Sequence, residues 1–92
     1  MNLRELAKGQ PCMIRVAGIC NRNPETTVLA HYRLGGTCGT GMKPPDMRGA
    51  WACSACHDAV DGRVRSTWSR CELRLMHAEG VFRTWAALEE LK

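Results

Sequence analysis

The chain has 92 residues, a formal net charge of +4 and six cysteines. A domain of this size buries only about 60–65% of the surface of its unfolded chain, so its hydrophobic core alone gives marginal stability. The cysteines therefore indicate a stabilising cross-link, called a staple below, made either by disulfides or by a bound metal ion. No segment approaches the roughly 18 consecutive apolar residues of a membrane span, so the sequence predicts no membrane partner.

The N-terminal segment helps to decide between the two kinds of staple. Residues 1–8 are charged and amphipathic, and they lack the apolar run of a secretory signal peptide. We therefore expect a cytoplasmic protein, in which disulfides are rare and cysteines more often bind a metal. The excess of 13 Lys and Arg over nine Asp and Glu is compatible with a polyanionic partner such as DNA, but the charge alone does not require one.

The first part of the chain predicts a short helix, two extended arms and a strand. Asn2 can cap a helix over residues 3–8. Residues 12–20 are expected to form two extended arms around a turn at Gly18. The β-rich run over residues 26–32 predicts a short strand.

The middle of the chain predicts a loop, a second strand and a second helix. Residues 35–46 are too rich in glycine and proline for a regular element, and long loops in small domains are often functional. Residues 51–53 are compatible with a short strand. Ser54 can then cap a helix that runs to Asp61 and ends at Gly62.

Residues 66–92 are predicted to be helical. Their apolar side chains recur at steps of three or four, which is typical of a helix face that packs against the rest of a domain. Gly80 interrupts this pattern at a cost of about 1 kcal/mol, so one bent helix and two separate helices both fit. The predicted buried face consists of Trp68, Cys71, Leu75, Ala78, Phe82 and Trp85.

Cys53 and Cys56 form a Cys-x-x-Cys pair at the start of the second predicted helix, a spacing typical of a metal site. Both thiolates can face one tetrahedral ion, and the helix N-terminus favours their negative charge. Cys12 and Cys20 are the best candidates for the second pair, because a turn joins their extended arms. Their separation is wider than the usual two to four residues. We predict a structural zinc ion held by these four thiolates.

The two remaining cysteines leave alternatives open. Cys38 lies in the glycine-rich loop, and Cys71 lies on the predicted apolar face of the last helix. Either could replace Cys12 or Cys20 as a ligand. A small buried hydrophobic side chain is the simpler interpretation of Cys71.

The histidines suggest a second metal site. His57 and Asp61 lie four residues apart on the second predicted helix, so they share one face and can bind one divalent ion. His31 lies on the first predicted strand, where a solvated histidine is the simpler interpretation if it is taken alone. His77, on the last helix, is interpreted as structural or exposed.

Several motifs in one order resemble the HNH nucleases, whose ββα-metal site is a two-stranded hairpin packed on one helix. The chain is more closely similar to a small family of prophage-encoded nucleases, the YbcO family. The resemblance covers residues 1–62 well and the last helix only in pattern. It rests on the Cys12/Cys20 region, Asn23-Pro24-Glu25-Thr26, Leu29-Ala30-His31, Cys38-Gly39-Thr40-Gly41, Lys43-Pro44-Pro45-Asp46 and Cys53-Ser54-Ala55-Cys56-His57-Asp58.

The resemblance implies roles for the matching residues. His31 takes the place of the general base, which draws a proton from the attacking water. Asp46 takes the place of the middle asparagine of the motif and would orient His31 or hold the loop. His57 takes the place of the final histidine, a ligand of the catalytic divalent ion, with Asp61 as a second ligand.

Two further expectations concern the ion and the DNA. HNH sites commonly carry His or Asp just before the general base, and this chain has Ala30 there, which cannot bind a metal. A site with few protein ligands leaves room for water and phosphate oxygens, which suits Mg²⁺. Arg33, Lys43 and Arg48 flank the loop and are candidates for contacts to backbone phosphates.

Taken together, these patterns predict one α+β domain over residues 1–92, a zinc-stapled ββα-metal domain of HNH or treble-clef-like type. It has a short N-terminal helix, a core motif over residues 12–62 and a helical segment over 66–92. The predicted function is metal-dependent hydrolysis of DNA phosphodiester bonds, directed by phage or host recombination or replication proteins. The alternative, which Ala30 favours, is a non-catalytic zinc module that binds nucleic acid or protein.

Overall fold

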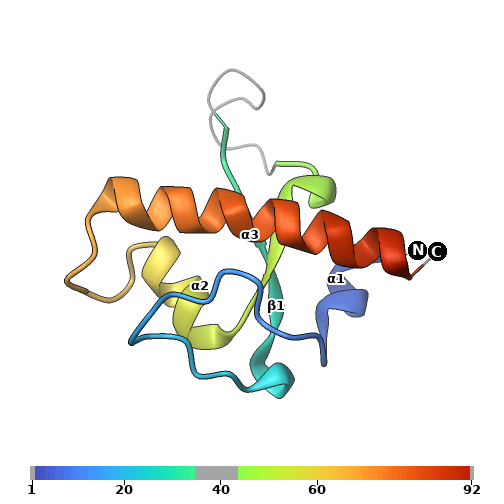
Figure 1. Cartoon of the computed structure of the whole chain (residues 1–92), viewed down its shortest axis with the longest axis horizontal. Coiled ribbons are helices and arrows are strands. Elements are labelled where there is room, and N and C mark those ends of the chain that lie inside the picture. The colour runs from blue at the N-terminus through green and yellow to red at the C-terminus, as the bar shows by residue number, and fades with distance from the viewer. Residues whose placement is uncertain (1, 35–43, 92) are drawn as a thin grey trace.

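The computed structural model describes residues 2–34 and 44–91 (Figure 1). It is a small α+β domain, as the sequence predicts, with helices around a two-stranded antiparallel sheet. None of the helices in these ranges is long and apolar enough to span a membrane. The elements are α1 (Leu3–Ala7), a 3₁₀ turn (Pro24–Thr26), β1 (Val28–His31), a second 3₁₀ turn (Asp46–Arg48), β2 (Gly49–Ala52), α2 (Ser54–Val60) and α3 (Arg70–Glu90).

The hairpin separates the molecule into two apolar clusters. Leu29 of β1 pairs with Trp51 of β2, and His31 pairs with Gly49. Because side chains alternate between the faces of a strand, Leu29 and His31 share one face and Ala30 lies on the other. The Leu29 face packs against α1 and the last turns of α3. The Ala30 face packs against α2 and the earlier part of α3, which Figure 1 shows running along both smaller helices.

Several predicted boundaries need correction. Strand β2 covers Gly49–Ala52 instead of residues 51–53, and the last helix begins at Arg70 instead of residue 66. The strand predicted over residues 26–32 is shorter, because Pro24–Thr26 form a 3₁₀ turn before it. Helix α2 is capped by Cys53 and not by Ser54: the Cys53 Sγ accepts a hydrogen bond from the Cys56 amide at 3.3 Å. The predicted cap was one residue late, because a thiolate replaces the usual hydroxyl or carboxylate in this role.

Helix α3 is one continuous helix across Gly80. It begins at a capping box, in which Ser69 accepts from the Glu72 amide and Glu72 accepts from the Ser69 amide, both at 3.1 Å. Gly80 is buried against Ile14: a Cβ at this position would lie 2.9 Å from Ile14 Cγ1 and 3.2 Å from its backbone. Gly80 therefore allows close packing and does not end the helix.

The buried face predicted for α3 is wrong. Leu75 and Phe82 are each 61% exposed, and Cys71 is exposed as well. The physical reason is that the true buried face is poor in large apolar side chains, so hydrophobic periodicity indicates the opposite side. The buried residues of α3 are Leu73, His77, Gly80, Val81 and Thr84.

Two polar side chains fasten α3 to the hairpin. Thr84 Oγ1 accepts from the Trp51 amide at 3.0 Å and donates to the Gly80 carbonyl at 2.8 Å. His77 Nε2 donates to the Ala30 carbonyl at 2.9 Å, and its ring meets that of Tyr32 edge-on. His77 is therefore buried and structural, one of the two interpretations that the sequence left open.

We expect Gly80→Ala to destabilise the protein by about 1–3 kcal/mol, because the added methyl group overpacks the contact with Ile14. Helix propensity alone predicts the opposite, a gain of about 1 kcal/mol. Denaturant unfolding of the zinc-loaded protein measures the sign. Ala86→Gly, at an exposed position of the same helix, is the matched control and should lose only the propensity difference of about 1 kcal/mol. A stabilised Gly80→Ala variant would contradict the close approach.

His77 is expected to make stability depend on pH. Burial lowers the pKa of His77 below its ordinary value of 6.5, so the folded state favours the neutral ring. The unfolded chain then binds more protons just below that value, and stability is lost as the pH falls through the lowered pKa. In His77→Gln the amide can keep the bond to Ala30 without titrating. The stability advantage of the wild type over this variant should shrink between about pH 8 and about pH 5 in denaturant unfolding, and a constant advantage would contradict the assignment.

Candidate functional site

Four cysteines from three segments meet beside α2. Cys12 and Cys20 lie on the chain between α1 and β1, while Cys53 and Cys56 lie at the start of α2. Their Sγ atoms all lie within 4.8 Å of one another. The four thiols that the sequence singled out therefore form one cluster, and this cluster could hold a metal ion such as zinc.

The spacing of the sulfurs fits a tetrahedral zinc ion. A Zn–S bond of about 2.3 Å places two tetrahedral sulfurs about 3.8 Å apart, and the sulfurs of Cys20 and Cys53 are separated by 3.8 Å. Backbone amides also point at the sulfurs, as thiolate acceptors require. The Arg15, Val16 and Asn21 amides donate to Cys12, Cys56 and Cys53 at 3.5, 3.4 and 3.5 Å respectively.

The thiols are coupled to one another. The hydrogen bond from Cys56 lowers the pKa of the Cys12 thiol to about 4, while the same contact and burial raise the pKa of Cys56. Burial also raises the pKa of Cys20. Four thiols crowded in this way cannot all ionise without a cation among them, so the cluster has the electrostatics of a metal centre.

Of the two remaining cysteines, the structure describes Cys71. Cys71 lies exposed on α3 and is no member of the four-cysteine cluster, so it does not replace Cys12 or Cys20. Its predicted burial as a small hydrophobic side chain is wrong, because that face of α3 points outward. Cys38 lies outside the described residues, as does Lys43.

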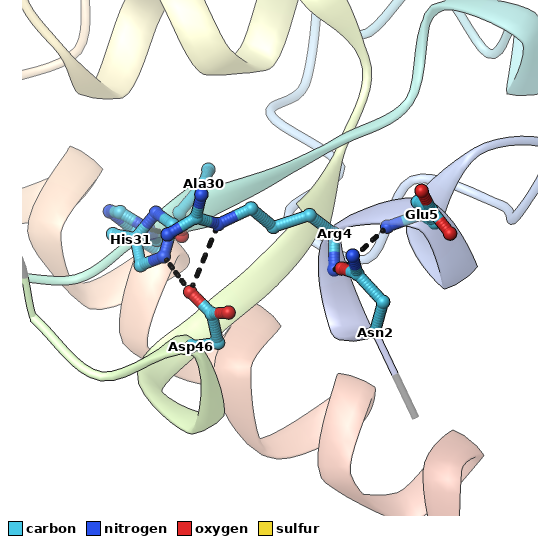
Figure 2. Close-up of polar contacts among 7 residues, drawn as sticks. Asn2, Arg4, Glu5, Ala30, His31 and Asp46 are labelled. Carbon is cyan, nitrogen blue, oxygen red and sulfur yellow. Dashed lines mark hydrogen bonds and ion pairs between the residues drawn. The ribbon is translucent and has the colours of Figure 1, made fainter.

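His31 and Asp46 form a hydrogen-bonded pair at the end of the hairpin (Figure 2). His31 Nε2 lies 2.7 Å from Asp46 Oδ1, and the histidine side chain keeps 21% of its surface exposed. Arg4 of α1 reaches across and donates its Nε–H to the same carboxylate oxygen at 3.3 Å. The hydrogen bond from His31, followed by the bond and charge of Arg4, lowers the pKa of Asp46 below its ordinary value of 3.8. Asp46 is therefore a carboxylate at neutral pH.

His57 and Asp61 form a second pair on α2. His57 Nε2 lies 3.1 Å from Asp61 Oδ2, so the two side chains share a helix face as their spacing predicts. Two adjacent ligands of an octahedral Mg²⁺, each at about 2.1 Å, lie about 3 Å apart. The donor set and spacing therefore fit a divalent ion. Arg63 also bonds Asp61 Oδ2, at 3.1 Å, and competes for that oxygen.

The two pairs lie on different sides of the hairpin. His31 projects from the Leu29 face, toward α1 and the Asp46 turn, whereas α2 lies against the Ala30 face. Ala30 itself is 1% exposed, and its carbonyl is occupied by His77. His31 stands at the last position of β1.

Two of the three predicted cationic residues lie in the part of the chain that the structure describes. Arg33 is exposed after β1, and Arg48 is half-buried beside the end of the hairpin. Arg4 and His77 were not predicted to support the site. No sequence pattern links Arg4 to Asp46, 42 residues away, and the sequence left open whether His77 is structural or exposed.

The family to which the chain belongs follows from comparison with known proteins. A family described as "Putative nuclease YbcO" matches residues 1–92. The chain belongs to this YbcO family.

Two curated YbcO relatives carry the same description. They come from Escherichia coli (strain K12) and Enterobacteria phage 82, and each is 60% identical over 63 residues. The matched stretch is 68% of this chain and 66% of each relative, so the chain spans just under two thirds of their length. A solved structure described as "Structure of a putative bacteriophage protein from Escherichia coli str. K-12 substr. MG1655" superposes with a TM-score of 0.79 at 41% identity, covering 95% of this chain and 96% of that one.

Removal of metal is expected to unfold this YbcO-family protein. A structural Zn²⁺ contributes on the order of 10 kcal/mol at neutral pH, which is comparable to the whole stability of a typical domain. A strong chelator should abolish the helical circular dichroism, and elemental analysis should find one zinc per chain. Cys53→Ser should lose the zinc, whereas Cys71→Ser, at an exposed cysteine outside the cluster, should retain it. Full helicity without metal would contradict the staple.

Proposed function

We propose that this chain is a metal-dependent endonuclease of the HNH type, which hydrolyses phosphodiester bonds of DNA. The observation that carries the proposal is the 2.7 Å contact between His31 Nε2 and Asp46 Oδ1 beside a partly exposed ring. The family description, which names a nuclease, supports the same reaction. The zinc of the cysteine cluster has a structural role in this proposal.

The contact with Asp46 assigns the two ring nitrogens of His31. Nε2 carries the proton and donates it to the carboxylate, so Nδ1 is the basic nitrogen and can accept a proton from water. Asp46 keeps this tautomer and stabilises the imidazolium that forms, as the carboxylate of a catalytic triad does. Arg4 holds the carboxylate in place through its bond to Oδ1. His31 is then the general base and Asp46 orients it.

These groups account for each bond and each proton of the hydrolysis. A proton of the attacking water moves to His31 Nδ1, and the water oxygen forms a bond to phosphorus. The bond from phosphorus to the leaving oxygen breaks, and that oxygen takes a proton from solvent. His57 and Asp61 would hold a divalent ion such as Mg²⁺, which would supply positive charge for the phosphate and the leaving oxygen. Arg33, Lys43 and Arg48 contribute affinity for neighbouring phosphates.

This proposal requires the substrate to lie across the end of β1. His31 and α2 face opposite sides of the hairpin. The attacking water would therefore reach the scissile phosphate from the His31 side, and the divalent ion would contact it from the α2 side. We further propose a cytoplasmic location, with phage or host recombination or replication proteins as partners.

One observation favours a second function, a non-catalytic zinc module that binds nucleic acid or protein. Ala30 occupies the position where HNH sites commonly place an additional metal ligand, and it is buried without a polar side chain. A divalent ion would then have only His57 and Asp61 as protein ligands. A decayed site on an intact zinc-bound fold accounts for this arrangement.

Nicking of supercoiled plasmid by the zinc-loaded protein tests the proposal. We expect cleavage that requires added Mg²⁺ or Mn²⁺. His31→Ala should lower the rate by about 10²–10⁴-fold, the usual contribution of a general base. Asp46→Asn should lower it by a smaller factor, and His57→Ala should raise the concentration of ion required. Lys8→Ala, at an exposed position of the cap of α1, is the matched control and should cleave normally.

Two results would contradict hydrolysis by this site. Cleavage that survives in His31→Ala would indicate another base or a contaminating nuclease. DNA binding without cleavage under every ion tested would favour the non-catalytic module.

A further inference from the structure

An apolar groove lies between the end of the hairpin and the outer side of α3. Its volume is about 220 Å³, and its walls include Tyr32, Arg48, Phe82 and Trp85, which together we call the aromatic groove. Phe82 is 61% exposed and Trp85 38%, with their rings edge-to-face at 5.2 Å between centroids. Large aromatic side chains exposed side by side are unusual on a small protein unless they bind something.

Arg48 adds a positive charge to the wall of this groove. Its Nη1 atom is buried and has no partner among the residues that the structure describes. This atom has almost no accessible surface, so a ligand in the groove would meet the charge of the guanidinium and not Nη1 itself. A ligand that combines a flat apolar surface with anionic or carbonyl oxygens would satisfy both features. A nucleotide has this combination, with a base to stack and a phosphate to accept.

The aromatic groove is joined to the His31–Asp46 pair through the 3₁₀ turn Asp46–Arg48. Asp46 binds His31, the Met47 carbonyl accepts a hydrogen bond from Trp85 Nε1, and Arg48 lines the groove. A backbone hydrogen bond also joins this turn to the groove, because the Tyr32 amide donates to the Arg48 carbonyl at 2.9 Å. The three successive residues Asp46, Met47 and Arg48 thus connect His31, the proposed general base, to the aromatic groove.

Arg74 and His77 hold the side chain of Tyr32, which forms part of the groove wall. Arg74 donates to Tyr32 Oη at 2.9 Å and stacks over its ring at 4.6 Å, while His77 meets the ring edge-on. A preorganised wall loses little conformational freedom when a ligand stacks against the groove, which favours specific binding.

We propose that the aromatic groove binds an unpaired nucleotide of the DNA substrate, with the base against Phe82 and Trp85 and a neighbouring oxygen accepting from Arg48. The proposal rests on the proposed nuclease function and narrows its substrate to DNA that contains a single-stranded stretch. In a duplex both faces of each base are covered by neighbours, so only an unpaired base can present a face to exposed aromatic rings.

Fluorescence anisotropy with a short labelled oligonucleotide, single-stranded or annealed to its complement, tests this substrate preference. The protein is zinc-loaded, and no Mg²⁺ or Mn²⁺ is added, so that binding is measured without cleavage. We expect the wild type to bind the single strand more tightly than the duplex. Phe82→Ala should weaken single-strand binding by on the order of tenfold, the effect of losing one stacked base, and Arg48→Met should weaken it as well.

Matched controls separate the groove from general effects. Leu75→Ala removes an apolar side chain of the same 61% exposure from α3 outside the groove, and Arg65→Met removes an exposed charge. Both should bind the single strand nearly as the wild type does. Equal binding by Phe82→Ala and Leu75→Ala overturns the proposal. A wild-type dimer in sedimentation that Phe82→Ala dissociates also overturns it, because the groove would then be a self-interface.

The assay also distinguishes failure of this inference from failure of the proposed function. Groove-dependent single-strand binding without metal-dependent cleavage of either the plasmid or a single-stranded oligonucleotide supports the inference and refutes hydrolysis. Metal-dependent cleavage with single-strand binding that Phe82→Ala leaves unchanged supports hydrolysis and refutes the role of the groove.

Discussion

The sulfur cluster is the contact on which the rest of the arrangement depends. The Ala30 face of the hairpin is lined by small side chains, so it buries little apolar area against α2. Hydrophobic packing alone would hold this short helix weakly. Four thiols converge where α2 begins, and they tie it to the chain before β1. The cysteine cluster therefore contributes to the orientation of α2, and with it to the position of His57 and Asp61, together with packing against α3.

Helix α3 is held to the hairpin in a different way. Its buried face has few large apolar residues, and its contacts with the strands depend on hydrogen bonds from His77 and Thr84 and on the close approach at Gly80. Such contacts are directional, so they fix the rotation of the helix about its axis. This rotation turns Leu75 and Phe82 outward and places Phe82 and Trp85 beside the turn that carries Asp46.

The parts of the molecule predicted correctly from sequence have strong local rules. The cap at Asn2, the Cys-x-x-Cys pair and the four-residue spacing of His57 and Asp61 all follow from helix geometry. The errors arise where long-range contacts override a local pattern. The apolar periodicity of α3 indicated the wrong face, because the buried side uses Gly, Thr and His. The bond from Arg4 to Asp46 joins residues with no pattern in common, and nothing in the sequence signals it.

On the proposed function, Ala30 explains why substrate and ion must act together. His57 and Asp61 alone provide two ligands, and Mg²⁺ bound by so few protein groups keeps several waters and depends on substrate phosphates for the rest of its shell. The ion would then bind firmly only when DNA lies across the end of β1. By linkage, DNA must bind more tightly in the presence of the ion by the same factor.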